Sequence, residues 1–310
     1  SELSEGRWVR ADVAASRIQM LLLALVLGMA FNVRRSLYEW IFPWLALALP
    51  LLVFIDSMLP GLLYPLDTPG SVRGRAAATF INPTIAGEAM LVLFLMACPV
   101  LKPVQRVALM LIVGAGVVLT LSRSAIIAWL VLWVILSFNR VLPRFGLILL
   151  LAVASAAPIL FGALSIYYGN QSDFGPALAD IEQRLNFFST GSLRDASAAE
   201  RSMVLKAGWD IFLNNVFAGA GPGATELWPD ATRNLGTHNQ FVMLAAEYGL
   251  CGVGVWLALG WILWHGKYFE ERALQQAVFL MFVLMTPFTH NMFDFLFWLL
   301  TFALASRRRI

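Results

Sequence analysis

Long apolar stretches separated by short polar breaks run along most of the chain. A bilayer core about 30 Å thick requires about 20 mostly apolar residues per crossing helix. Lipid offers the backbone no hydrogen-bond partner, so each stretch is predicted to be helical. The pattern predicts nine membrane spans in this chain, at roughly 15–31, 38–59, 84–101, 104–121, 124–138, 146–168, 240–264, 274–289 and 291–305. The fifth, eighth and ninth are short, and a re-entrant pair is the alternative there.

The basic residues of the short loops predict the orientation of these spans. They all fall on one side, namely Arg34, Arg35, Lys102, Arg106, Arg140, Arg144, Lys267, Arg272 and the arginines at 307–309. The positive-inside rule makes that side cytoplasmic, which places the first residue of the chain outside. Three further spans upstream would bring both ends inside, so we expect about twelve spans in the full protein.

The predicted fold is therefore an all-α integral membrane protein, a polytopic helix bundle with one large external segment. We expect an N-terminal part of the bundle at 1–168, the external segment at 169–239 and a C-terminal part of the bundle at 240–310. The external segment is the one sizeable polar region of the sequence. Because binding and catalytic residues concentrate on such connecting segments, we expect the chemistry there.

An amphipathic helix is predicted within the external segment. Ser197 and Glu200 have the spacing of a capping box, and "RSMVLKAGWDIFLNN" follows. Its apolar residues recur at helical spacing, at positions 203, 204, 207, 211 and 212. The pattern places Arg201 in the first turn, where exposed backbone amides favour anions, and two asparagines from Asn214 end the helix. The following "FAGAGPGATELW" is interpreted as a tight turn.

The composition agrees with a membrane protein and narrows the chemistry. The chain is 59% hydrophobic and 13% charged, whereas soluble domains carry about 25% charged residues. The net charge of +3 comes largely from arginines that flank apolar runs, so no nucleic-acid partner is expected. Cys98 and Cys251 lie inside apolar runs and are interpreted as small hydrophobic residues. Without a cluster of metal-ligand spacing, we expect neither a metal nor a cofactor.

Three residues at the external edge of the bundle carry the candidate chemistry. His238, in "GTHNQF", precedes the seventh span, and Arg123, in "LTLSRSAIIAWL", occupies a short polar break between two spans. An arginine at such a place is costly unless it meets a wet cavity or an anion. The alternatives are a helix cap for His238 and snorkelling for Arg123. Arg201 and Arg75 are predicted to lie on the same external face. The sequence "THN" occurs at 237–239 and again at 289–291, and the second occurrence places His290 on that face too.

Glu247 lies in the seventh span, nine residues after His238. At 100° per residue the two side chains lie on opposite sides of a helix. Glu247 is therefore not expected to orient His238, and we expect it to make interhelical hydrogen bonds instead.

Four short motifs, "GRAAATFINPTIAGEAM", "TLSRSAIIAWL", "ERSMVLKAGWDIFLNNVFAGAGPG" and "GTHNQFVMLAAEYG", occur in an order that resembles bacterial O-antigen ligases over about residues 75–295. The resemblance implies a metal-independent glycosyltransferase of the bacterial inner membrane with its active site on the periplasmic face. Its donor is a glycan on undecaprenyl pyrophosphate, and lipid A–core oligosaccharide is the acceptor of ligases. The related O-antigen polymerases and protein O-oligosaccharyltransferases share the motif pattern.

The resemblance also implies roles for individual residues. Arg123 and Arg201 correspond to pyrophosphate-binding arginines, and His238 corresponds to the general base. Arg184 and Arg194 are alternatives for the second arginine. The supporting residues are expected to be Arg75, Arg194, Asn239 and His290.

Two general considerations support an enzyme. A histidine with an ordinary pKa near 6.5 suits general-base work at neutral pH, and direct attack would invert the anomeric centre. A lipid-linked glycan flippase is the competing class, and it predicts charges near the bilayer midplane. The candidate charges instead gather at one external edge. Among the enzymes we favour a ligase, since one long external segment with an amphipathic helix suits an acceptor that arrives from the membrane.

Overall fold

The computed structural model describes residues 2–65, 68, 75–150, 152, 196–225, 236–266, 269–289 and 292–305. The described part of the chain is helical, without strands, as predicted. It divides into two compact units. One comprises Ser1–Tyr38 together with Arg194–Ile310, and the other comprises Glu39–Leu193. The three parts predicted from the sequence were defined by their side of the membrane, whereas the two units are defined by packing. The three-part organisation therefore stays a prediction.

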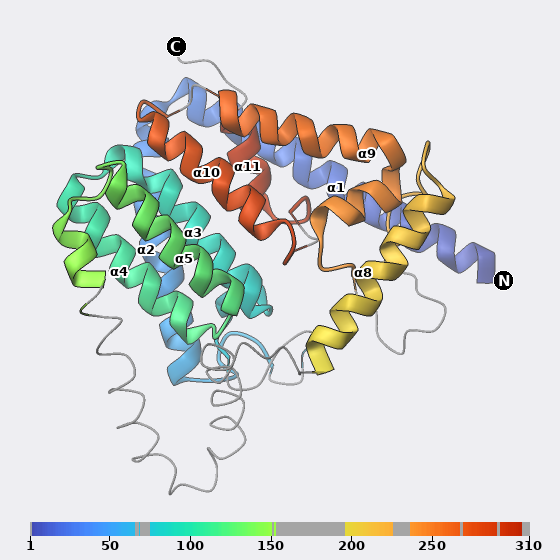
Figure 1. Ribbon diagram of the computed structural model, residues 1–310, viewed down its shortest axis with the longest axis horizontal. Helices are drawn as coiled ribbons and strands as arrows, with labels where there is room; N and C mark the ends of the chain where they lie inside the picture. The colour runs from blue at the N-terminus through green and yellow to red at the C-terminus, as the bar shows by residue number, and fades with distance from the viewer. Residues whose placement is uncertain are drawn as a thin grey trace, which may run out of the picture. The chain divides into compact units, whose positions relative to one another are not determined.

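The unit Glu39–Leu193 is built on one buried helix. It holds most of α2 (Arg35–Met58), and all of α3 (Pro83–Ala97), α4 (Pro103–Leu119) and α5 (Arg123–Phe138). Nearly every residue of α3 is buried, and α4 and α5 pack against it and against each other (Figure 1). Small residues permit the close approach: a Cβ added at Gly87 would lie 2.6 Å from that of Ala125.

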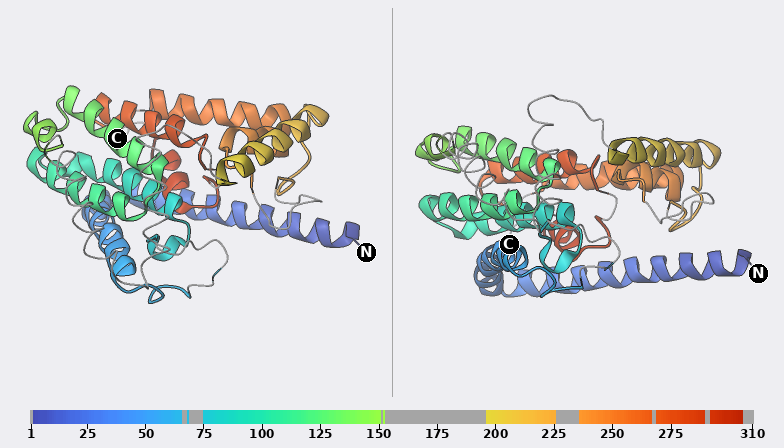
Figure 2. Two further views of the ribbon diagram at one scale, coloured as in Figure 1. Left: turned by 60° about the horizontal axis from the view of Figure 1, so that its bottom comes forward. Right: turned by 90° about the horizontal axis from the view of Figure 1, so that it is seen from below.

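The unit Ser1–Tyr38 with Arg194–Ile310 joins the two ends of the chain. Its helices are α1 (Glu2–Val33), α8 (Ala196–Asn214), α9 (Gln240–His265), α10 (Arg272–Met285) and α11 (Leu296–Ala305). α1 packs against α11, and α9 packs against α10, α11 and α8 (Figures 1 and 2). A core of aromatic rings, including Trp256, Phe282 and Trp298, fills the space among α9, α10 and α11. α9 is thus the central helix of this unit.

Within the described residues, four helices are long and apolar enough to cross a membrane, at Ala11–Val33, Arg35–Met58, Pro83–Val100 and Gln240–His265. Four shorter apolar helices coincide with other predicted spans, and the sixth predicted span lies almost entirely outside the described residues. The long helices leave bulky apolar side chains uncovered, such as Trp40, 66% exposed, and Trp261, 65% exposed. Such faces suit a membrane protein, whereas the number of spans and their orientation stay predictions.

Candidate active site

His238 sits in a sharp turn at the start of α9. Asn239 is the N-cap, and its Oδ1 accepts a hydrogen bond from Val242 N at 3.1 Å, the arrangement that makes Asn a favoured residue at this position. Thr237 Oγ1 donates to the carbonyl oxygen of Asn239 at 3.1 Å. His238 itself has φ 49°, a left-handed conformation that is uncommon for residues other than glycine. Asn239, which the resemblance implies as a supporting residue, thus caps α9.

The turn changes the protonation of the imidazole. Burial and, to a smaller extent, the positive charge of Arg201 lower the pKa of His238 to about 4. A group whose pKa lies well below 7 is neutral at neutral pH, so His238 has a ring nitrogen free of a proton and able to accept one. The side chain is half-buried, not closed off. A general base must be unprotonated and accessible, and both properties meet that condition, whereas a pKa of about 4 makes the imidazole a weak base until its pKa rises.

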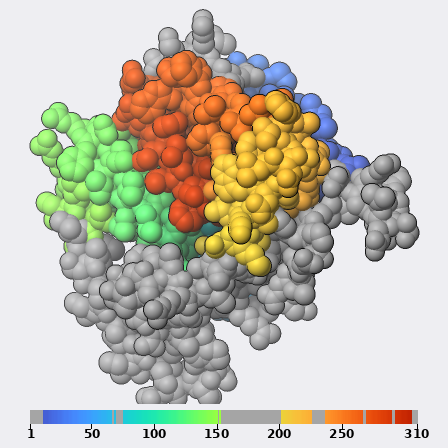
Figure 3. Space-filling view, turned by 45° about the vertical axis from the view of Figure 1, so that its right-hand side comes forward, coloured from blue at the N-terminus to red at the C-terminus, as the bar shows by residue number. Residues whose placement is uncertain are grey.

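Arg201 reaches this turn because α8 lies directly against α9 (Figures 2 and 3). The contact point on α8 is Gly208, where an added Cβ would lie 2.7 Å from Val242 Cγ1 and 2.8 Å from Thr237 Cγ2. A larger residue at 208 would therefore push α8 away from the histidine turn. Gly208 was not singled out by the sequence pattern, and it is one of the residues that bring Arg201 and His238 together.

Two details of the predicted amphipathic helix are wrong. α8 already includes Ala196, so Ser197 lies inside the helix and is not its cap, and Arg201 lies in the second turn instead of the first. The physical reason is the high helix propensity of the alanines around Ser197, which extends the helix toward the N-terminus. Of the predicted apolar face, Val204 is buried and Met203 is 67% exposed, and Gly208 is buried as well. The predicted end at Asn214 is confirmed.

Arg123 belongs to the other compact unit, where it is the first residue of α5. Ser122 precedes it, and the Ser122 Oγ bonds to Thr84 Oγ1 at 3.3 Å and to Ser124 Oγ at 3.2 Å. Thr84 lies in the first turn of α3, so the N-terminal ends of α3 and α5 meet at Arg123. Both ends carry the positive pole of a helix dipole. An anion beside Arg123 would therefore be stabilised by more than the guanidinium.

Arg75 is bound to the turn that precedes α5. Its Nε donates to the carbonyl oxygen of Thr120 at 2.9 Å. The loop that carries it is held by Asp56, whose Oδ2 accepts hydrogen bonds from Ala77 N at 2.7 Å and Ala78 N at 3.1 Å. Asp56 is a buried carboxylate at the end of α2 that the sequence analysis passed over.

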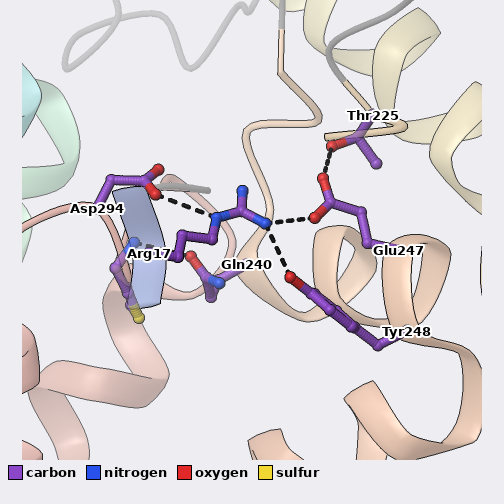
Figure 4. A network of polar contacts seen from close by, with 7 residues as sticks. Arg17, Thr225, Gln240, Glu247, Tyr248 and Asp294 are labelled. Carbon is purple, nitrogen blue, oxygen red and sulfur yellow. Dashed lines mark hydrogen bonds and ion pairs between the residues drawn. The ribbon is translucent and has the colours of Figure 1, made fainter. Parts of the chain in front are cut away.

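The sequence pattern also did not predict the buried ion-pair network in the unit that comprises Ser1–Tyr38 and Arg194–Ile310 (Figure 4). Arg17, on α1, donates from Nη1 to Glu247 Oε2 and to Tyr248 Oη, the latter at 3.2 Å. Its Nε donates to Asp294 Oδ1 at 3.2 Å, and Thr225 Oγ1 donates to Glu247 Oε1 at 2.7 Å. The predicted interhelical role of Glu247 is confirmed. The one sign of this network in the sequence is the presence of acidic residues inside predicted spans, since a buried carboxylate in a membrane requires a cation as partner.

The glycine-rich segment after α8 packs against a break in α9. Gly249 interrupts the helix with φ 60° and ψ −142°. Around it, Leu250 N donates to the carbonyl oxygen of Val216 at 2.8 Å, while Ala220 N and Gly221 N donate to the carbonyl oxygens of Ala246 and Glu247 at 2.9 and 3.0 Å. The segment is thus more than the tight turn that was predicted, because it provides hydrogen-bond partners for the broken helix.

Three of the candidate residues lie outside the described part of the structure: Arg184, Arg194 and His290. Their predicted roles stay predictions. Within the described residues no group of three or more His, Cys, Asp or Glu side chains is arranged to hold a metal ion.

Comparison with known proteins finds one family match. Residues 108–257 match the family model described as O-antigen ligase, and no curated protein matches the chain. The matched segment begins in α4 and ends in α9, so it contains Arg123, Arg201 and His238. Over this segment the chain is similar to the O-antigen ligase family, whose members are glycosyltransferase-like membrane enzymes.

Proposed function

We propose that this protein is an O-antigen ligase, which transfers a glycan from undecaprenyl pyrophosphate to a hydroxyl group of lipid A–core oligosaccharide. The observation that carries the proposal is the pairing of a neutral, half-buried His238 with Arg201 inside the segment that matches the family. A base and a cation side by side are the two groups that glycosyl transfer to a hydroxyl requires. The reaction needs neither a metal nor a cofactor in this proposal.

His238 acts as the general base. It takes the proton of the acceptor hydroxyl while that oxygen forms a bond to the anomeric carbon, and the bond from this carbon to the pyrophosphate oxygen breaks. The glycan is thereby transferred with inversion, and undecaprenyl pyrophosphate leaves with its electron pair. Arg201 stabilises the negative charge that grows on the leaving group. General-base catalysis of this kind contributes about 10²–10⁴-fold to the rate.

Donor binding also activates the base in this scheme. Without donor, the charge of Arg201 contributes to the low pKa of His238. A pyrophosphate that pairs with Arg201 cancels that charge and adds negative charge of its own, so it raises the pKa of His238. The imidazole is therefore a stronger base when the donor is in place.

Arg123 is the second pyrophosphate-binding residue in this proposal, on the strength of the family resemblance of "SRSA". The helix dipoles of α3 and α5 support an anion at that position, and Arg75, bound to the turn before α5, adds a second cation. His290 and Arg194 are proposed as supporting residues on the resemblance alone.

The proposed location is the bacterial inner membrane, with the site on the periplasmic face. Donor and acceptor are both lipid-anchored, so they reach the histidine turn from the bilayer. The same donor and the same base also serve an O-antigen polymerase or a protein O-oligosaccharyltransferase. These alternatives differ only in the acceptor, so the acceptor has to be tested directly. A flippase would bind the donor without cleaving it.

The test is incubation of the purified protein with lipid-linked O-antigen and lipid A–core, followed by separation of the products. Capped lipid A–core supports the ligase, a longer lipid-linked chain supports a polymerase, and donor left intact supports a transporter. His238→Ala should reduce transfer by about 10²–10⁴-fold. Full activity of that variant would refute the base. His265→Ala is the matched control, because His265 lies at the opposite end of α9 and stacks on Trp261 at 3.7 Å.

A further inference from the structure

The first residues of α9 form a separate short segment, residues 240–248, which ends at the break at Gly249. The break is built into the backbone. The φ of 60° favours glycine, and a Cβ at this position would lie 2.4 Å from the carbonyl oxygen of Val216. The orientation of segment 240–248 is therefore set by its own contacts and not by the remainder of α9. His238 and Asn239 immediately precede this segment, so its orientation also sets theirs.

The start of segment 240–248 is anchored by Gln240. Its backbone N donates to the carbonyl oxygen of Thr286 at 2.9 Å, which ties the segment to the end of α10. Its side-chain Oε1 accepts a hydrogen bond from Met292 N at 2.9 Å, which ties the segment to the turn before α11. Gln240 is fully buried. A change in position of the 292–294 turn is therefore transmitted directly to the residue two positions after His238.

The far end of segment 240–248 is anchored by Glu247. Its side chain is 0% exposed, and its two oxygens bind Arg17 and Thr225. A buried carboxylate is unfavourable unless a cation and hydrogen bonds compensate it. Arg17 and Thr225 supply both.

Arg17 is the one residue in Figure 4 that connects both anchors. Through Glu247 it holds the far end of segment 240–248, and through Asp294 it holds the turn that binds Gln240. The guanidinium offers several donors in one plane, so a single side chain from α1 can serve Glu247, Tyr248 and Asp294 together. A lysine in its place could not span the same partners with one ammonium group.

We propose that Arg17 is a positioning residue for His238, which fixes the histidine turn beside Arg201 by clamping both ends of segment 240–248. The proposal rests on the function assigned above to His238, and Arg17 itself touches no substrate in it. Replacement of Arg17 leaves His238 and Arg201 in the protein but displaces His238 from its position. A displacement of about 1 Å can reduce catalysis by about 100-fold.

The experiment uses the full chain in lipid nanodiscs with Arg17→Met, and two quantities are measured. The first is the kinetics of glycan transfer, for which we expect kcat to fall about 10–100-fold with little change in the KM for the lipid-linked donor. The second is the pKa of His238, read from the pH dependence of its modification by diethyl pyrocarbonate with peptide mass spectrometry. We expect it to rise toward its ordinary value as the turn leaves its buried position.

Two further variants separate displacement from charge, because Arg17→Met also leaves Glu247 and Asp294 uncompensated, and negative charge by itself raises a histidine pKa. Arg17→Met with Glu247→Gln removes the buried charge and the clamp together, so it also protects against a failure to fold. Asp294→Asn weakens the hold on the 292–294 turn without adding a charge. Both should lower kcat in the same direction as Arg17→Met.

Arg106→Met is the matched control for loss of a buried arginine. Arg106 binds only backbone oxygens in the hydrogen bonds described for it, those of Cys98, Leu101 and Val141 in the other compact unit. Its loss should lower thermal stability and leave both the kcat of the folded protein and the His238 pKa unchanged.

The proposal is overturned if Arg17→Met and the double variant lower thermal stability only, with kcat per folded protein and the His238 pKa as in the parent. It is supported if kcat and the pKa change together while Arg106→Met changes neither. Failure of the general-base role is a separate result. If His238→Ala retains full transfer, that role is refuted, and the His238 pKa in the Arg17 variants still decides whether Arg17 holds the turn.

Discussion

Replacement of Arg201 by methionine should raise the pKa of His238, and by a limited amount. The pKa lies at about 4 instead of 6.5, with burial as the larger cause and Arg201 as the smaller. Arg201 therefore accounts for less than half of a gap of about 2.5. Removal of its charge should raise the pKa by at most about 1, which corresponds to about 1–2 kcal/mol at 1.36 kcal/mol per pKa unit.

The assay is NMR of the protein labelled at histidine and reconstituted in detergent micelles. The chain has three histidines, and His265→Gln helps to assign the signals. Methionine preserves most of the apolar stem of Arg201 and so retains its covering of the turn, while Arg201→Lys keeps the charge and should leave the pKa of His238 close to that of the parent.

Two results would refute this reasoning. No change in Arg201→Met would mean that the guanidinium does not act on the imidazole. A return to 6.5 would mean that Arg201 and not burial dominates, and that the histidine turn is open to water. The reasoning is supported if the pKa of His238 rises in Arg201→Met by less than half of the difference between 4 and 6.5 and does not rise in Arg201→Lys.

Three further outcomes follow from the described contacts. The kcat/KM for transfer should stay level as the pH falls from neutral and decline only as the pH passes through about 4, where free His238 becomes protonated; a decline centred near 6.5 in the pH–rate profile would contradict the low pKa. Gly249→Ala should destabilise the protein by more than about 3 kcal/mol in denaturant unfolding, because alanine adds backbone strain and meets the Val216 carbonyl. Gly254→Ala is its control, since an added Cβ there meets nothing within 4 Å. Asp56→Ala should cost about 1–3 kcal/mol and expose the loop that carries Arg75 to limited proteolysis, because two buried backbone amides lose their acceptor; equal protease resistance of the variant and the parent would show that the loop is held by other contacts.

The helices could be predicted wherever apolar length and a local cap both signal them. The seventh predicted span, 240–264, agrees with α9 to within one residue, because Asn239 caps an unbroken apolar run. The start of α8 was missed, since a capping-box pattern and helix-forming alanines compete over the same few residues, and the alanines prevail.

The residues that carry the chemistry of the candidate site were easier to predict than the residues that position them. In the structure the charge of Arg201 acts on His238. Arg17 gave no local signal, because its partners lie more than 200 residues away in the sequence. Gly249 looked like any glycine in an apolar helix, since its conformation depends on Val216 and Gly221, which belong to a different segment. Long-range pairing of this kind has no local pattern in a single sequence.

The break in α9 has a consequence for how the protein matures in the membrane. During insertion, an unbroken α9 is the form that satisfies its own backbone, because lipid supplies no hydrogen-bond partners. The bent form requires the backbone groups of 216–221 as replacements. We therefore expect α9 to enter the bilayer straight and to bend only when the preceding segment docks. The direction of its first residues would then be acquired late, as the last step that makes the enzyme competent.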